Sequence, residues 1–204
     1  MTEEFGREFW EERYSGHAAA GEREPSPHLV AEVRDLAPGT ALDAGCGEGA
    51  EAIWLAGRGW RVTAVDIAAA ALDRAREHAR GTAGQIDWVQ ADLTAWTPPP
   101  GRFDLVCAHY VHPAGSRQAL LARLAAAVAP GGTLLVVEHA HAASHGAGHD
   151  PSVPAARVGA AELAAALDPA RWEVAVTEPP ARQVSTHDGR QVPLRDVILR
   201  ARRR

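Results

Sequence analysis

The sequence Ala41-Leu42-Asp43-Ala44-Gly45-Cys46-Gly47-Glu48-Gly49 carries the strongest structural signal in the chain. An apolar run ends there at an acid and continues into three glycines at alternating positions. Glycine lets the backbone turn sharply and approach a ligand closely. The pattern therefore predicts a strand over 40–43, a tight turn, and a helix over 50–56. In open α/β sheets the ligand lies beyond the carboxyl ends of the strands, so this first turn is a candidate binding site.

Strand-like and helix-like segments alternate on both sides of this turn. Further strands are expected at 61–65, 86–90, 103–108, 132–138, 172–177 and 195–201, and further helices at 3–15, 27–36, 69–79, 120–128 and 159–167. Such alternation predicts an α/β fold with a doubly wound, seven-stranded, mostly parallel sheet of the Rossmann-like kind. No helix separates the last two strands, which predicts a C-terminal antiparallel hairpin. No break in composition marks a second domain, so residues 1–204 are expected to form a single domain.

Composition excludes several classes of function. The 204 residues include 26 acidic and 21 basic side chains, a formal net charge of −5, which argues against a nucleic-acid partner. Every basic residue is arginine, so mechanisms that need a catalytic lysine are excluded. Cys46 and Cys107 are too few for a disulfide framework or a zinc ribbon. With no secretory signal and no apolar run of about 20 residues, we expect a cytoplasmic protein without a membrane partner.

Three acids follow three successive strands and narrow the choice of ligand. Asp66 comes 21 positions after Gly45, where an acid can accept hydrogen bonds from both ribose hydroxyls. Asp43 would repel the pyrophosphate of a dinucleotide and suits a cationic group such as an amino-acid ammonium. Asp92 could accept a hydrogen bond from an adenine amino group. Together the acids favour S-adenosylmethionine, although Gly45, Gly47 and Ala50 formally satisfy the dinucleotide pattern, so a nicotinamide oxidoreductase remains an alternative.

The segments 41–49, 65–67, 91–93, 103–106 and 130–132 resemble, in order and spacing, the motifs of class I S-adenosylmethionine-dependent methyltransferases. The resemblance covers roughly residues 28–202. It implies that Asp43, Gly45, Gly47 and Gly49 surround the methionine portion of the cofactor and that Asp66 holds the ribose. It also implies that Ile67, Asp92 and Leu93 border the adenine. Ala68 departs from the family, where many members have a Ser or Thr helix cap, and this should cost local stability rather than function.

The segment Phe9-Trp10-Glu11-Glu12-Arg13-Tyr14 resembles the lid helix of the small-molecule branch of that family, which includes tellurite and thiopurine methyltransferases. The resemblance implies that residues 1–27 form a lid helix and loop. Trp10 and Tyr14 would approach the methionine and sulfonium, to which an aromatic face is attracted by cation–π interaction. The alternative is a helix whose aromatic side chains only pack against the core.

Two groups of histidines are candidates for chemistry. His109 and His112 follow the fourth strand, and we predict that they act as a base or orient the substrate, with His109 also touching the cofactor. The alternative is that they form a hydrogen-bonded wall of the pocket. His139, His141, His145 and His149 could bind a transition metal or a metalloid, but the Ala and Gly residues around them offer no supporting shell. We therefore predict no metal site.

The sequence predicts an S-adenosylmethionine-dependent methyltransferase that transfers a methyl group in line to a small molecule and releases S-adenosylhomocysteine. One alternative keeps the cofactor but has a thiol or metalloid acceptor, as in a detoxifying enzyme. Another is a metal-binding or regulatory protein that uses the same fold without catalysis.

Overall fold

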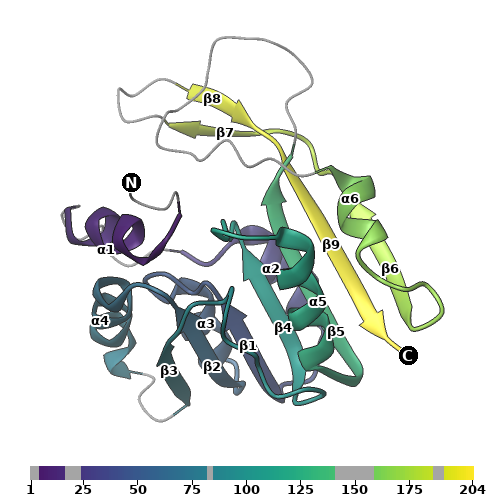
Figure 1. The fold of residues 1–204 in the computed structure, drawn as a ribbon, viewed down its shortest axis with the longest axis horizontal. Helices are drawn as coiled ribbons and strands as arrows, with labels where there is room; N and C mark the ends of the chain where they lie inside the picture. The colour runs from purple at the N-terminus through teal and green to yellow at the C-terminus, as the bar shows by residue number, and fades with distance from the viewer. Residues whose placement is uncertain (1–4, 17–23, 82–84, 141–158, 186–190) are drawn as a thin grey trace.

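The computed structural model describes residues 5–16, 24–81, 85–140, 159–185 and 191–204. Its core is a seven-stranded sheet in the order β3-β2-β1-β4-β5-β9-β6 (Figure 1). The strands of this sheet are β1 (Thr40–Ala44), β2 (Arg61–Asp66), β3 (Ile86–Gln90), β4 (Phe103–His109), β5 (Val128–His139), β6 (Trp172–Thr177) and β9 (Asp196–Arg203). A second, two-stranded sheet pairs β7 (Arg182–Ser185) with β8 (Gln191–Leu194).

The first five strands are parallel, and β9 is antiparallel to both of its neighbours, β5 and β6. The predicted mostly parallel sheet and the antiparallel pairing of the last two strands of that sheet are confirmed. The chain proceeds from β1 outward to β2 and β3, then crosses to the other side of β1 to form β4 and β5. The carboxyl ends of β1 and β4 therefore meet at the point where the strand order changes direction.

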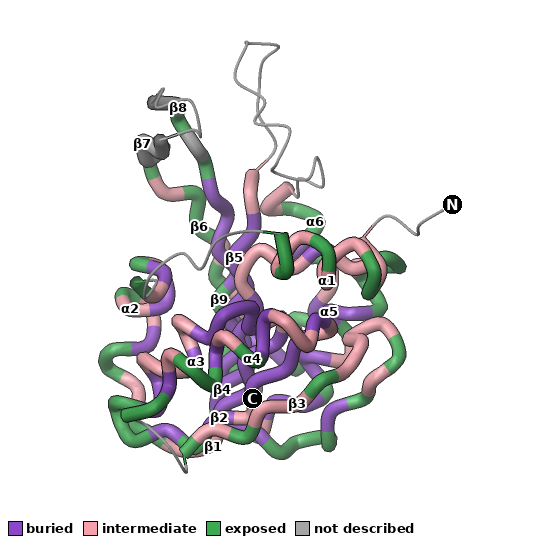
Figure 2. The backbone as a smooth tube through the Cα atoms, turned by 90° about the vertical axis from the view of Figure 1, so that its left-hand side faces the viewer, coloured by how far each residue is buried: buried purple, intermediate pink, exposed green. Residues whose placement is uncertain are grey.

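Helices cover both faces of the sheet. They are α1 (Arg7–Gly16), α2 (Pro27–Val33), α3 (Ala50–Ala56), α4 (Ala69–His78) with the 3₁₀ turn Ala79–Gly81, α5 (Arg117–Ala127) and α6 (Ala160–Ala165). Because successive side chains of a strand point to opposite faces, Leu42 packs with α5 and α6 whereas Ala41 packs with α2, α3 and α4. The two cores that result bury most of the central strands (Figure 2).

Several predicted boundaries were wrong for local reasons. The helix expected from 120 begins at Arg117, because the Ser116 hydroxyl accepts a hydrogen bond from the Ala119 amide and caps it. The helix expected to reach 36 ends at Val33. The strand expected from 132 begins at Val128, which pairs with Phe103 across an irregularity in the ladder. Strands β7 and β8 were not predicted.

Two elements lie beyond the carboxyl ends of the parallel strands, where open α/β sheets bind their ligands. Helix α1 and the β7–β8 pair lie toward the end of the molecule to which the arrowheads of β4 and β5 point (Figure 1). Within the described residues, no helix is both long enough and apolar enough to cross a membrane.

Candidate cofactor and active site

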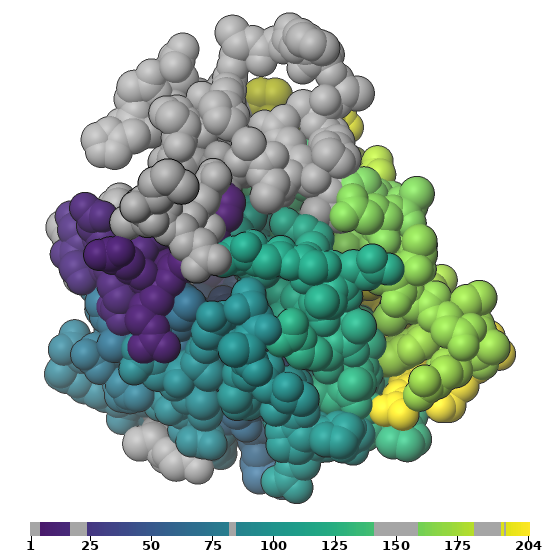
Figure 3. Space-filling model, in the orientation of Figure 1, coloured from purple at the N-terminus to yellow at the C-terminus, as the bar shows by residue number. Residues whose placement is uncertain are grey.

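A cavity of about 690 Å³ lies at the carboxyl ends of β1, β2 and β4. This is the topological switch point at which open α/β sheets bind their ligands. Helix α1 forms one wall and rests on the elements of the first half of the sheet (Figure 3). Every residue predicted to bind the cofactor or take part in the chemistry lines this cavity, namely Trp10, Tyr14, Asp43, Gly45, Gly47, Gly49, Asp66, Ile67, Asp92, Leu93, His109 and His112.

The glycine turn between β1 and α3 is shaped for close approach. Gly45, Gly47 and Gly49 all have positive φ, at 77°, 51° and 85°, a conformation that favours glycine over other residues. A Cβ atom added to Gly47 would lie 2.9 Å from the Tyr14 hydroxyl oxygen, and one added to Gly45 would lie 2.7 Å from Val111. A larger residue at Gly45 or Gly47 would therefore clash with Val111 or Tyr14, which line the same cavity.

Asp66 joins this turn to the next one along the sheet. Its Oδ2 accepts a hydrogen bond from the Gly47 amide at 2.8 Å, and its Oδ1 accepts one from the Ala68 amide at 2.9 Å. Burial raises the pKa of Asp66, while the amides of Ala68 and Gly47 lower it. Each carboxylate oxygen can accept a further hydrogen bond, so Asp66 retains acceptor capacity toward the cavity.

Asp43 carries a buried oxygen that lacks a hydrogen-bond partner among the described residues of the cavity. Its side chain is buried, and its Oδ2 has no hydrogen-bond partner among the described residues. Burial, followed by the negative charge of Glu51, raises the pKa of Asp43 well above its ordinary value. A buried acceptor without a donor costs free energy that a ligand carrying an ammonium group would recover. The donor and acceptor set thus fits an amino-acid headgroup and does not fit a pyrophosphate.

The third acid closes a tight turn after β3. Asp92 Oδ1 accepts hydrogen bonds from both the amide and the hydroxyl of Thr94, each at 2.7 Å. Ile67 and Leu93 line the same end of the cavity and give it apolar surfaces. A carboxylate beside two apolar side chains is suited to a flat heterocycle that carries an amino group.

At the other end of the cavity, His109 and His112 are uncharged at neutral pH. Burial, and then the charge of His28, lowers the pKa of His109 to about 3. Burial, followed by the charges of Arg117, His139 and Arg13, lowers the pKa of His112 to about 4. Neither ring nitrogen of His109 has a partner among the described residues. Both side chains can make hydrogen bonds, but such low pKa values make them weak bases.

Helix α1 is attached to α4 by a contact that the sequence did not reveal. The Glu11 carboxylate accepts hydrogen bonds from the amides of Ala69 at 2.7 Å and Ala70 at 3.1 Å. These are the first two residues of α4, whose own N-cap, Ala68, has no side chain that can cap it. Glu11 therefore supplies from α1 the cap that is missing at Ala68, and its charge complements the helix dipole.

The aromatic rings of Trp10 in α1 and of Phe5, which precedes α1, extend this attachment to the substrate end. The Trp10 ring stacks against His112 with centroids 6.4 Å apart, and the Phe5 ring lies 5.7 Å from the same imidazole. The Trp10 indole N–H donates to the Phe5 carbonyl. No residue of α1 itself is fully buried, so surface contacts, among them those of Glu11 and Trp10, hold it over the cavity.

The structure also brings together residues that the sequence analysis did not connect. Asp196 accepts hydrogen bonds from His28 and His139, each at 3.1 Å. His139 belongs to the histidine run considered for metal binding, and His141, His145 and His149 lie outside the described residues. Within the described part of the chain, Asp43, Cys107 and His109 place possible metal-ligand atoms within 4.8 Å of one another. Burial raises the pKa of the Cys107 thiol well above its ordinary value, which disfavours the thiolate that a metal requires.

Residues 41–132 match the family model described as a methyltransferase domain. This segment is a methyltransferase domain. It contains the glycine turn, the three acids that follow the strands, and His109 and His112, and the cofactor of such domains is S-adenosylmethionine. The matched residues contain β1 to β4, the helices between these strands, α5 and the start of β5.

Relatives of known name extend the similarity beyond this domain. The trans-aconitate 2-methyltransferase of Paracidovorax citrulli is 40% identical over 116 residues, which cover 55% of this chain and 43% of that protein. The enzyme of the same name from Azoarcus is 34% identical over 163 residues, covering 76% of this chain and 62% of that protein. The chain thus spans less than half the length of the first relative and under two thirds of the second.

A solved structure shares the fold of the whole described chain. It comes from work on the conversion of a disulfide bond into a thioacetal group during echinomycin biosynthesis. Its TM-score is 0.71 at 22% identity, with 97% of this chain and 92% of that chain covered. The two proteins therefore share the Rossmann-like fold over nearly the whole length of this chain.

The substitution Glu11→Ala tests the attachment of α1. Loss of an N-cap costs about 1 kcal/mol, equivalent to roughly a fivefold change in an equilibrium constant. We expect the Ala69 and Ala70 amides to exchange with solvent about fivefold faster, and cofactor affinity to fall by up to the same factor. Hydrogen exchange and titration calorimetry measure the two effects. Glu12→Ala, on the exposed side of the same helix, is the matched control, and equal exchange rates in the two variants would contradict the capping role.

Protons should leave the protein when S-adenosylmethionine binds. A ligand cation favours the ionised carboxylates, so binding lowers the raised pKa values of Asp43 and Asp66 and releases their protons. Affinity should accordingly increase as pH rises from about 5 to 7, above the usual carboxyl range. Calorimetry in buffers of different ionisation enthalpy counts the released protons. Asp43→Asn should remove most of the release, and binding heats that are independent of buffer in the unmodified protein would refute this account.

Proposed function

We propose that the whole chain is an S-adenosylmethionine-dependent methyltransferase that acts on a small molecule. The observation that carries this proposal is the buried Asp43 oxygen without a partner, placed beside a glycine turn that is open to the cavity. Such an arrangement calls for a cationic amino-acid headgroup at the carboxyl end of β1. The match of residues 41–132 to the methyltransferase domain supports the same conclusion.

The cofactor would occupy the side of the cavity formed by the glycine turn and the acids. In this arrangement Asp43 and the glycine turn hold the methionine portion, and Asp66 accepts hydrogen bonds from the ribose hydroxyls. Asp92, with Ile67 and Leu93, borders the adenine. Trp10 and Tyr14 present aromatic surface to the sulfonium from α1, which acts as the lid, while residues 1–4 and 17–23 of the expected lid segment lie outside the described residues. When bound, the cofactor supplies an electrophilic methyl group.

Charge in the cavity argues for an acceptor that is not a polyanion. The described lining carries two arginines, Arg13 and Arg74, and Arg74 pairs with Glu48 at 2.8 Å. Six acidic side chains line the same cavity: Glu24, Asp43, Glu48, Glu51, Asp66 and Asp92. The relatives named for trans-aconitate act on a molecule with three carboxylates, and this balance of charge disfavours such a substrate. The acceptor we propose is therefore a small, uncharged molecule.

His109 and His112 would orient this acceptor. Their low pKa values keep both imidazoles neutral, so each can donate one hydrogen bond and accept another without introducing charge. Alignment of the nucleophile with the methyl carbon is the main requirement of an in-line transfer.

Transfer of a ¹³C-methyl group from labelled S-adenosylmethionine to a panel of acceptors tests the proposal. The panel contains phenols and alcohols, a thiophenol, tellurite and trans-aconitate, and the ¹³C shift of the product identifies the atom that is methylated. We expect methylation of an uncharged hydroxyl compound and none of trans-aconitate. Methylation of the thiophenol or tellurite alone would favour the detoxifying alternative, and no product from any acceptor would favour the non-catalytic one.

A pair of variants on and after β3 separates cofactor binding from the rest of the reaction. Asp92→Asn removes a charged acceptor at the adenine end, and loss of one hydrogen bond of about 0.5–1.5 kcal/mol should raise the KM for the cofactor about two- to tenfold. The matched control is Asp87→Asn, an exposed carboxylate on β3, the strand that precedes Asp92. An equal KM in the two variants would contradict the placement of the adenine.

A further inference from the structure

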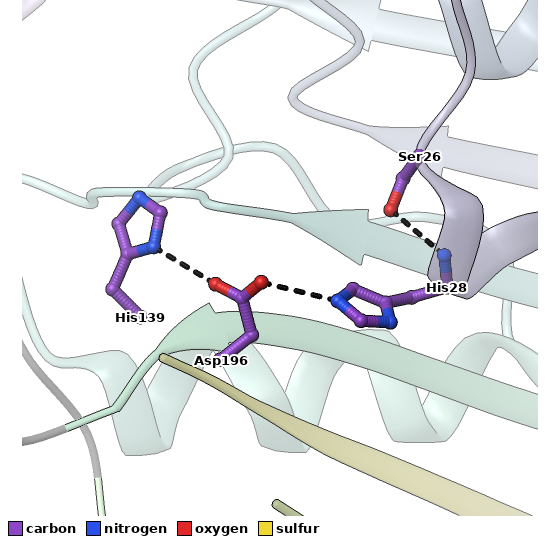
Figure 4. Close-up of polar contacts among 4 residues, drawn as sticks. All are labelled: Ser26, His28, His139 and Asp196. Atoms are coloured by element: carbon purple, nitrogen blue, oxygen red, sulfur yellow. Dashed lines mark hydrogen bonds and ion pairs between the residues drawn. The ribbon is translucent and has the colours of Figure 1, made fainter. Parts of the chain in front are cut away.

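Three side chains from distant parts of the sequence form a polar array at the edge of the cavity. Asp196, the first residue of β9, is almost completely buried and uses one oxygen for each of two histidines. His28 Nε2 lies 3.1 Å from its Oδ2, and His139 Nδ1 lies 3.1 Å from its Oδ1. Figure 4 shows the two rings on opposite sides of the carboxylate. The Ser26 hydroxyl accepts a hydrogen bond from the His28 amide, which fixes the first turn of α2.

His139 connects this array to the cavity. It is the last residue of β5, lines the cavity, and stacks on the Tyr110 ring with centroids 4.4 Å apart. Since the two nitrogens of an imidazole lie on different sides of the ring, a contact from Nδ1 to Asp196 leaves Nε2 directed away from the carboxylate. Figure 4 shows this nitrogen on the far side of the ring from Asp196. The stacking and the hydrogen bond together fix the orientation of the ring.

The contact with Asp196 also selects the tautomer. An ionised carboxylate only accepts hydrogen bonds, so the Nδ1 of neutral His139 must carry its hydrogen. The Nε2 atom then holds a lone pair, which is the state required of a proton acceptor. A buried carboxylate that orients an imidazole and stabilises its protonated form is the arrangement that activates nucleophiles in other enzyme classes. His109 differs, because neither of its nitrogens has such a partner among the described residues.

We propose that His139, oriented by Asp196, accepts the proton of a hydroxyl group on the methyl acceptor, an inference that rests on the proposed function. The O–H bond breaks and its proton moves to His139 Nε2. The oxygen electron pair forms the new bond to the methyl carbon, and the pair of the breaking carbon–sulfur bond stays on sulfur. The positive charge that leaves the sulfonium ends on the imidazolium of His139, where Asp196 offsets it. His139 is thus a catalytic residue and Asp196 a positioning residue.

This assignment narrows the class of acceptor. A carboxylate is already ionised at neutral pH and needs no base, whereas an alcohol or a phenol must lose a proton as the new bond forms. A histidine base that is oriented by a buried carboxylate therefore helps only the methylation of an alcohol or a phenol. The acceptor we infer is therefore a hydroxyl compound, consistent with the scarcity of positive charge in the described lining of the cavity.

The first experiment reads the tautomer and does not depend on activity. In ¹⁵N-histidine-labelled protein with S-adenosylhomocysteine bound, the His139 signals should show hydrogen on Nδ1 and a bare Nε2 at pH 8. Among the described residues, the ionisable groups in this array or beside His139 are Asp196 from β9, His28 from α2, and Tyr110 and His112 from the segment after β4. In Asp196→Asn the preference for Nδ1–H should be lost. Hydrogen on Nε2 in the unmodified protein would overturn the proposal.

The second experiment measures initial rates with the hydroxyl acceptor found in the ¹³C-methyl panel. His139→Gln and Asp196→Asn should lower kcat about 10²- to 10⁴-fold, the range for general-base catalysis, with little change in the KM for the acceptor. His78→Gln, on α4 outside the array, is the matched control. Its kcat should stay within about twofold of the unmodified protein, far less than the decrease expected for loss of a general base. The ionised thiophenol should be methylated equally well by His139→Gln and the unmodified protein.

The outcomes separate this inference from the function on which it rests. If S-adenosylhomocysteine does not bind to the unmodified protein, the proposed function fails. If it binds and a hydroxyl compound is methylated, but His139→Gln retains full kcat, only the assignment of the base is overturned. Methylation that is confined to carboxylates would also overturn it, because such acceptors have no proton to lose.

Discussion

The carboxylate of Asp66 ties together the two turns on which the cavity is built. One oxygen holds the Gly47 amide in the turn after β1, and the other holds the Ala68 amide before α4. Both turns leave the sheet at adjacent parallel strands, so this single side chain fixes the distance between the glycine loop and the start of α4. Burial raises the pKa of Asp66, and a positively charged ligand would lower it again by favouring the ionised carboxylate. The carboxylate that holds the two turns therefore also responds to the charge of the ligand.

Around this point the cavity divides into two electrostatic halves. The glycine turn and the three acids form a half that favours a cation, whereas His112 lies in a half kept neutral by burial, with His109 at the boundary beside Asp43. Helix α1 lies over the cavity, and its adjacent residues Trp10 and Glu11 contact His112 and the first residue of α4 respectively. Binding in the first half is thereby linked to the helix that encloses the second. Closure of the cavity by α1 and capping of α4 both depend on the Glu11 carboxylate.

Much of this arrangement could be predicted from local sequence. The glycine turn, Asp66 and Asp92 each follow a strand directly, and parallel strands place their carboxyl ends at one edge, so the pattern was sufficient to bring these residues together. Glu11 could not be assigned in this way, since it caps a helix 58 positions away along the chain. The pairing of His28 with Asp196 spans 168 positions. An acid at the start of the apolar run Asp196-Val197-Ile198-Leu199 was a signal that a buried polar partner was needed.

The central claim is that the acid-lined carboxyl edge of the sheet binds S-adenosylmethionine and its product S-adenosylhomocysteine rather than a dinucleotide. Titration calorimetry with S-adenosylhomocysteine, and in parallel with NAD, tests it on the unmodified protein, on Asp66→Ala and on the exposed control Asp87→Ala. The account predicts micromolar binding of S-adenosylhomocysteine to the unmodified protein and the control, binding at least tenfold weaker to Asp66→Ala, and none of NAD, because two hydrogen bonds to a buried carboxylate contribute about 1.5–3 kcal/mol each. Binding of NAD in place of S-adenosylhomocysteine, or affinity unchanged by Asp66→Ala, would contradict it.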